Sequence, residues 1–143
     1  MSALTVHRPV LRSFRVLACQ GDNRGEDTGV AMRLDFQQEI EFGLAVPEIE
    51  GAPLMVGVKV KLETLATNQN DASDVARYSG EYEARFYYPA GVTEDAVAPL
   101  LDDHDYQYAL VAQAFPLAMT HLRRELQAMG LDARELPLGL PYH

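Results

Sequence analysis

The chain alternates between apolar and polar residues over most of its length, and this period of two limits what it can fold into. In residues 30–46 the even positions read Val, Met, Leu, Phe, Gln, Ile, Phe, Leu and Val, whereas the odd positions are mostly charged, polar or small. Successive side chains of a β-strand point to opposite faces of a sheet, so this run predicts a long strand with one apolar face. Its weakest point is at Gln37 and Gln38, where the strand could be interrupted.

The same alternation recurs in three further segments, residues 10–17, 54–63 and 76–88. Polar or Gly- and Pro-containing turns separate the four segments, at residues 21–27, 47–53 and 68–74. Short turns join antiparallel neighbours, because parallel strands need a long crossover connection. The sequence therefore predicts a four-stranded antiparallel meander.

The period changes to that of a helix after the fourth segment. Thr93 stands in the position of an N-cap, which predicts a short helix over residues 93–101. From about residue 105 to 129, apolar residues recur every three or four positions, which predicts a long helix with one face on the sheet. Gly130 is a typical stop signal. Pro116 either kinks this helix or marks its true first turn.

Strands that come first and helices that follow them are typical of the α+β class. The 143 residues fit one domain, residues 1–143, which is large enough to bury its own core without disulfides or metal. One layer of helix covers only one face of a sheet. Because apolar residues remain on the other face and on the outer side of the helix, we expect the chain to self-associate.

The charge balance excludes several classes of partner. The chain carries 12 Lys and Arg against 21 Asp and Glu, a net charge of -9 with His neutral. Contacts with phosphate need a surplus of basic residues, so neither a nucleic acid nor an anionic membrane surface is an expected partner. No run approaches the roughly 20 apolar residues that insert into a membrane as a helix. Residues 1–16 lack the apolar stretch of a signal peptide, and the single Cys19 cannot form an internal disulfide, so we expect a cytoplasmic protein.

One cluster of side chains could support catalysis. Asp102, Asp103, His104 and Asp105 combine carboxylates with an imidazole, so a small α+β enzyme with its site there is one hypothesis. The alternative is a solvated helix start, whose carboxylates complement the helix N-terminus. The other histidines are isolated, and the chain has no Gly-rich phosphate loop, Gly-x-Ser-x-Gly or Cys-x-x-Cys motif. We therefore predict that the protein is not an enzyme, has no cofactor or metal, and uses Cys19 as a small core residue rather than as a nucleophile.

The first strand differs in charge from the rest of the chain. Residues 1–20 hold three Arg and no acidic residue, so all 21 acidic residues follow it. The alternation places Val10, Phe14 and Val16 on one face together with Arg12. A basic strand on an acidic body is where we expect a partner to dock.

The carboxyl-terminal part of the chain contains a recognisable order of motifs. A strand ending in Phe86-Tyr-Tyr-Pro is followed by a short helix, by Phe115-Pro116 inside a long helix, by Gly130 and by Leu136-Pro-Leu-Gly-Leu-Pro. This order resembles the SecB family of protein-export chaperones, in which a Phe-Pro pair opens the conserved part of the long helix. In that family a Gly ends the helix and a Leu-rich, Pro-containing crossover segment follows. The Tyr-x-Gly-x-Tyr-x-x-x-Phe pattern of the preceding strand is also similar to the family's fourth strand.

The resemblance implies a molecular chaperone that holds unfolded or nascent polypeptides in apolar grooves without ATP. It also implies a homotetramer, a dimer of dimers with the helices packed between the sheets. Two roles are open within this class: protein export together with the Sec motor ATPase, or service to one dedicated partner such as an antitoxin. A structural scaffold without a client is a further hypothesis.

Two features depart from the family pattern. The family has a second helix after the crossover segment and then a polar tail that contacts the motor, and neither is expected before His143. The family's first strand carries acidic residues that help to dock the motor, whereas this one carries Arg12 and Arg15. Both departures favour a dedicated or divergent role over export.

The candidate site residues follow from the resemblance together with the alternation, and each client-facing residue could equally be a core residue. The expected client-facing residues are Phe42, Leu44, Tyr82, Phe86, Leu136, Leu138 and Leu140. The expected partner-docking residues are Asp71, Asp74, Arg12 and Arg15.

Overall fold

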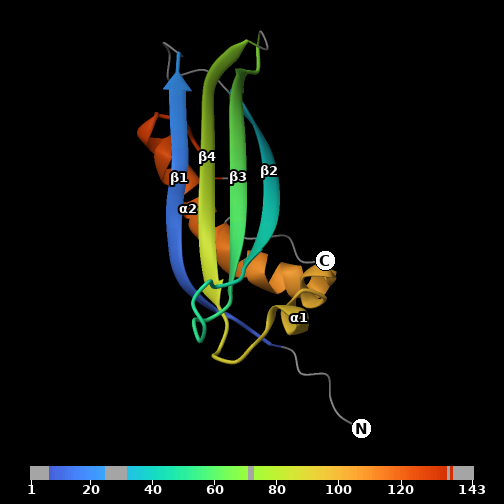
Figure 1. Cartoon of the computed structure of the whole chain (residues 1–143). Helices are drawn as coiled ribbons and strands as arrows, with labels where there is room; N and C mark the ends of the chain where they lie inside the picture. Colours follow the sequence, from blue (N-terminus) through green and yellow to red (C-terminus); the bar gives the residue numbers. More distant parts are fainter. Residues whose placement is uncertain (1–6, 25–31, 71–72, 135, 137–143) are drawn as a thin grey trace.

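The computed structural model describes residues 7–24, 32–70, 73–134 and 136 (Figure 1). Its elements are, in chain order, β1 (Val10–Asn23), β2 (Met32–Ala45), β3 (Met55–Asn68), β4 (Asp74–Tyr87), α1 (Glu94–Val97), a 3-10 helix (Leu100–Asp102) and α2 (His104–Ala128). The four strands form one antiparallel sheet, and α2 crosses one of its faces diagonally (Figure 1). The predicted α+β class, with a four-stranded antiparallel sheet followed by a short and a long helix, is confirmed.

The order of the strands in the sheet is β1-β4-β3-β2, so the predicted meander is wrong for the first strand. Strands β2, β3 and β4 do follow one another as hairpins, but β1 pairs with β4 at the opposite edge from β2. The physical reason is burial. The two strands with the most completely apolar inner faces, β3 and β4, occupy the centre of the sheet, and the two less apolar strands lie at its edges.

The two faces of the sheet differ in chemistry. On the face toward α2, which we call the helix side, the even-numbered side chains of β3 and β4 form the core with the buried stripe of α2. On the outer face, the odd-numbered side chains are mostly charged or polar. The largest fully buried side chains are Tyr82, Phe86, Phe115, Leu62, Met119, Leu122, Leu126, Val56, Val58, Val60 and Val97.

Two irregularities interrupt the alternation of β1. Its pairing with β4 shifts between Leu11 and Ser13 and again between Val16 and Ala18, so that one extra residue bulges out at each place. A shift of one residue moves the following side chains to the other face. Val16 therefore lies on the helix side, as Phe14 does, but Val10 pairs with Tyr87 on the outer face, so the predicted common face is wrong for Val10.

Strand β2 continues without interruption at its expected weak point. Gln37 pairs with Glu63 and Gln38 with Leu62, in unbroken register with β3. The long strand predicted for this part of the chain is therefore confirmed, and the interruption is not observed.

The helices begin and end at the expected signals, with one difference. The short helix ends at Val97 and continues after Pro99 only as the 3-10 turn, because proline lacks the backbone N–H that an α-helix needs. Helix α2 begins at the capping side chain of Asp103, which accepts a hydrogen bond from Tyr106 N, and continues through Pro116, which is therefore not its first turn. Gly130, with φ of 84°, follows its last turn. Neither helix is long and apolar enough to cross a bilayer within the described part of the chain.

Candidate functional site

Strand β2 carries a row of apolar side chains that the fold leaves only partly covered. Helix α2 packs on β3, β4 and β1, whereas β2 lies at the open edge beyond β3. Its helix-side residues are half-buried, although those opposite them on β3 are buried. We call this row the β2 strip, formed by Leu34, Phe36, Ile40, Phe42 and Leu44.

The β2 strip offers two kinds of contact to an extended polypeptide. Its side chains supply apolar surface on one face of the strand. Its outer edge supplies backbone N–H and C=O groups, because β2 pairs only with β3 in the described sheet. Extended peptides add to open edges in this way, with main-chain hydrogen bonds giving affinity and alternate side chains giving specificity.

The structure separates the predicted client-facing residues into three groups. Phe42 and Leu44 belong to the β2 strip. Tyr82 and Phe86 have no exposed surface, because α2 covers them on the central strand β4, so the folded chain offers neither of them to a client. Leu136 is half-buried against the core. Leu138 and Leu140 lie outside the described residues.

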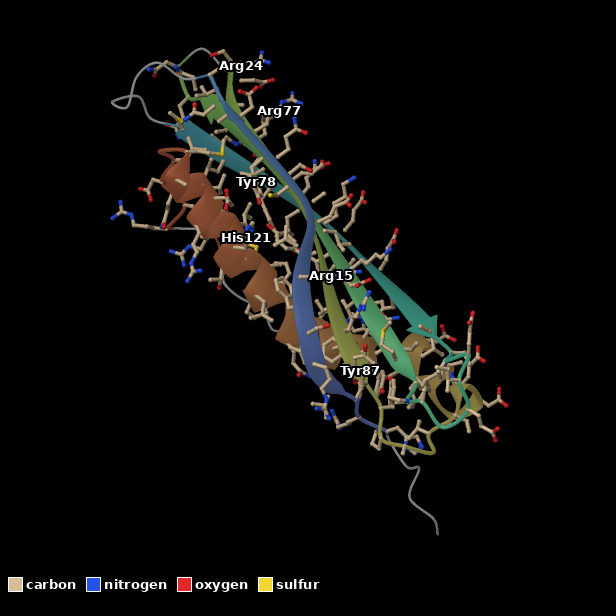
Figure 2. All side chains as sticks on the ribbon, turned by 60° about the vertical axis from the view of Figure 1, so that its left-hand side comes forward. Arg15, Arg24, Arg77, Tyr78, Tyr87 and His121 are labelled. Carbon is tan, nitrogen blue, oxygen red and sulfur yellow. The ribbon has the colours of Figure 1, made fainter. Side chains whose placement is uncertain are left out.

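Tyr82 belongs instead to a polar network inside the core, which joins β4 to α2. Its hydroxyl oxygen lies 2.9 Å from His121 Nδ1 and 3.2 Å from the hydroxyl oxygen of Tyr78. Its ring stacks on Phe14 of β1, with 5.7 Å between the ring centroids. Burial raises the pKa of both tyrosines, so both hydroxyls stay protonated at neutral pH and can donate. The network holds the helix on the sheet, with Tyr78 on β4 and His121 on α2 (Figure 2). Sequence reasoning missed it because His121 stands alone in the sequence.

The acidic cluster before α2 is a helix start. Asp103 caps the helix, with 3.0 Å between its carboxylate oxygen and Tyr106 N, and Asp102 ends the 3-10 turn. His104 and Asp105 are exposed in the first turn. Among the described residues, no group of three His, Cys, Asp or Glu side chains could hold a metal ion. This arrangement is that of a solvated helix start, with Asp103 as its capping residue.

Cys19 is exposed near the end of β1, so its predicted place in the core is wrong. It pairs in register with Gly80 on the edge strand β1, which has β4 as its one neighbour in the described sheet. The edge position explains the exposure, because alternation alone does not distinguish an edge strand from a central one.

The predicted docking residues do not form one site. Asp74 begins β4 and pairs with Arg77, with 3.2 Å between Arg77 Nη2 and Asp74 Oδ2. Arg15 pairs with Glu83 farther along the sheet, and Figure 2 shows Arg15 well separated from Arg77. Arg12 is exposed at the first irregularity of β1. Asp71 lies outside the described residues.

Near the Arg77 end, the outer face has an open hollow of about 710 Å³, lined by residues of all four strands. Charged side chains in its wall have partners close in sequence: Asp22 pairs with Arg24, Asp35 with Arg33 and Arg77 with Asp74. Because these charges compensate one another, the hollow has no strong preference for a ligand of one sign.

Glu83 is a buried carboxylate on the outer face, held between two arginines. Its residue is 8% exposed, and its Oε1 accepts from Arg85 Nε at 2.8 Å and from Arg15 Nη2 at 2.9 Å. Partial burial raises the pKa of Glu83, but the hydrogen bonds from Arg85 and then from Arg15 outweigh burial and hold the pKa below its ordinary value. The cluster ties the edge strand β1 to β4.

We expect Glu83→Gln to lower the free energy of unfolding by about 1–2 kcal/mol at pH 7, since the hydrogen bonds lose their charge and Arg15 is partly screened by solvent. A group whose pKa is lowered by folding stabilises fully above its unfolded pKa and loses that effect as the pH falls through its folded pKa. Urea unfolding should therefore show a difference in the free energy of unfolding between wild type and variant at pH 7, and this difference should narrow below about pH 4. A difference in the free energy of unfolding that stays constant down to pH 3 would contradict the role assigned to this carboxylate.

Comparisons with known proteins identify solved structures with a similar fold. No protein-family model matches the sequence, and no curated protein matches it. Among solved structures, the chain is similar to the Mycobacterium tuberculosis SecB-like chaperone Rv1957, in complex with a ChAD peptide from the Rv1956 HigA1 antitoxin, with a TM-score of 0.62 and 21% identity over 95% of this chain and 91% of that one. A protein of unknown function from Streptococcus agalactiae aligns with a TM-score of 0.33 and 16% identity over 81% of this chain and 94% of that one. By its four-stranded antiparallel sheet, its two carboxyl-terminal helices and this similarity to Rv1957, the chain has a SecB-like fold.

Proposed function

We propose that the protein is a SecB-like molecular chaperone or adaptor that holds unfolded or nascent polypeptides on the β2 strip without ATP. The observation that carries the proposal is the half-exposed apolar face of an edge strand that α2 leaves open. The similarity in fold to Rv1957, which was solved with a bound antitoxin peptide, supports it.

The physics of the β2 strip suits holding rather than folding. Burial of apolar surface stabilises by about 25 cal/mol per Å², so each half-exposed side chain adds a modest contribution to binding. Several such contacts along an extended client act together, and each can be released separately. The net charge of -9 keeps a protein with exposed apolar surface soluble, because like-charged copies repel one another.

For the client, we propose one dedicated partner, such as an antitoxin, in preference to general export with the Sec motor ATPase. The peptide that Rv1957 binds comes from an antitoxin, which supports this choice. The basic residues of β1 support it as well, since Arg15 lies on the first strand, where the SecB family carries acidic residues that help to dock the motor.

For the assembly, we propose a homotetramer built as a dimer of dimers. The edge strand β1 exposes Val16 and Leu17, each 39% exposed, and the outer side of α2 exposes Leu117, which is 40% exposed. These two apolar surfaces lie on different elements, so they can support two kinds of interface between copies.

The experiment is light scattering of an aggregating client, such as chemically unfolded citrate synthase, with native mass spectrometry of the same sample. We expect near-stoichiometric protein to suppress aggregation without ATP and the mass to correspond to four chains. A monomer that leaves aggregation unchanged would exclude the chaperone and favour a scaffold without a client.

A further inference from the structure

One end of the outer face carries exposed apolar side chains that the core does not use. Register places Val10, Tyr87, Met55 and Ala45 in one row across the four strands, at the end of the sheet where β1 begins. Val10 is 53% exposed, and residues 46–53 add Val46 at 53% and Ile49 at 75% beside the row. Three of the six large apolar side chains that the described part of the chain exposes therefore gather at this end.

A recess lies beside this row. The next row holds Ser13, Arg85, Gly57 and Gly43, of which only Arg85 is large. A Cβ atom built on Gly43 would have no heavy atom within 4 Å, so the space over this residue is open. At the neighbouring Gly57, a Cβ atom would lie 3.7 Å from Glu83 Oε2 and 3.9 Å from Met55 Sδ, so these two side chains border the space over the two glycines.

Two guanidinium groups border the recess, and Glu83 holds both of them in place. Arg15 and Arg85 share the single acceptor Oε1 of this buried carboxylate, so the group carries a surplus of one positive charge. The Arg15 side chain is 53% exposed and the Arg85 side chain 35%. A guanidinium has five N–H donors, and Glu83 engages only the Nε and Nη2 nitrogens of Arg15, which leaves donors for a second carboxylate.

The positive charge lies on the β1 side of this end. Arg12 is exposed on β1, whereas on the β2 side Lys59 is in register with Glu41 and the loop of residues 46–53 carries the exposed Glu48 and Glu50. The positive surplus is therefore confined to Arg12, Arg15 and Arg85 around Glu83.

We propose that this end of the outer face, which we call the arginine patch, docks a polypeptide segment in which apolar side chains alternate with carboxylates. An apolar side chain fills the recess over Gly43, and a flanking carboxylate pairs with Arg15 or Arg85. A polyanion is disfavoured, because Glu83 and Glu41 interrupt the positive charge and the body of the protein is acidic. The patch faces away from α2, on the opposite side of the sheet from the β2 strip, so it can bind a partner while a client is held.

The test is fluorescence anisotropy with the labelled peptide Gly-Ser-Glu-Leu-Glu-Phe-Glu-Gly-Ser, beside a peptide in which Lys replaces each Glu. We expect the acidic peptide to bind at least tenfold more tightly than the basic one, and we expect its binding to weaken as salt is added. Equal binding of the two peptides, or none, overturns the proposal. Inorganic phosphate that displaces the acidic peptide as well as unlabelled peptide does would overturn it in favour of an anion site.

Two variants locate the site. Gly43→Gln fills the recess, and Arg12→Glu reverses a charge without changing Glu83. We expect each variant to lower the affinity for the acidic peptide about tenfold. Arg24→Glu makes the same change of charge at the far end of the sheet, and should leave binding within about twofold. Equal losses in Arg12→Glu and Arg24→Glu would show that net charge alone attracts the peptide, against the proposal.

A competition experiment separates this proposal from the proposed function. Arg12→Glu, which lies on β1 and outside the β2 strip, should keep full suppression of client aggregation, and an excess of acidic peptide should leave that suppression unchanged. If the peptide abolishes suppression, the two surfaces are one and the second docking surface is excluded.

Discussion

Replacing Gly80 with valine is expected to lower the free energy of unfolding by about 3 kcal/mol, because the new side chain would overlap a buried ring. A Cβ atom on Gly80 would lie 2.5 Å from the Tyr82 hydroxyl oxygen and 2.8 Å from two of its ring carbons. The ring cannot move aside at low cost, since it is fully buried, stacked on Phe14 and hydrogen-bonded to His121. The Tyr-x-Gly-x-Tyr pattern is therefore a packing requirement of this helix–sheet interface.

The chain offers a matched control in Gly43, a glycine of the edge strand with open space where a Cβ would stand. We expect Gly43→Val to change the free energy of unfolding by less than about 0.5 kcal/mol, or to raise it slightly, since valine suits a strand better than glycine does. Urea unfolding of both variants beside wild type measures the difference. Equal effects of the two substitutions would mean that Tyr82 does not lie over Gly80 as described.

The local elements could be predicted because each has a short-range cause. The alternation of residues 30–46 and 54–63 marks β2 and β3, and the change of period marks α2. Two features needed long-range information. Alternation shows the faces of a strand but not its neighbours, so the pairing of β1 with β4 was missed. The irregularities of β1 were missed as well, because they depend on how β1 aligns with β4.

The same limit explains the result for the candidate site. Phe42 and Phe86 have equivalent positions in equivalent patterns, but one lies on the edge strand β2 and the other on the central strand β4. Only strand order decides which of them stays accessible. The arginine patch depends on register too, since Arg15, Glu83 and Arg85 come together only across β1 and β4. The surplus of arginine in the first strand indicated a basic surface from the sequence. The sequence did not indicate that Glu83 and Arg85 lie beside it.

A single substitution in the β2 strip is expected to weaken the holding of a client without abolishing it. Burying a whole phenylalanine side chain is worth about 1.5–3 kcal/mol, and Phe42 is already half-buried, so Phe42→Gln should require roughly threefold to tenfold more protein for the same suppression of aggregation. Glu41→Gln changes the neighbouring residue, whose side chain points to the outer face, and should retain full activity. Light scattering measures both variants.

Stability must be measured alongside, because Phe42 also packs against the core. We expect Phe42→Gln to remain folded by circular dichroism at the temperature of the assay, since the residue is only half-buried. If Glu41→Gln loses as much activity as Phe42→Gln, the client contacts the outer face and the assignment to the β2 strip is wrong.

The most direct measurement places a photo-reactive benzoylphenylalanine at position 42 in one sample and at position 41 in another, each mixed with an unfolded client and irradiated. These adjacent positions share one strand but point to opposite faces of the sheet. The proposed function predicts strong cross-linking of the client from position 42 and little from position 41. Cross-linking from position 41 alone, or from neither position while aggregation is still suppressed, would contradict it.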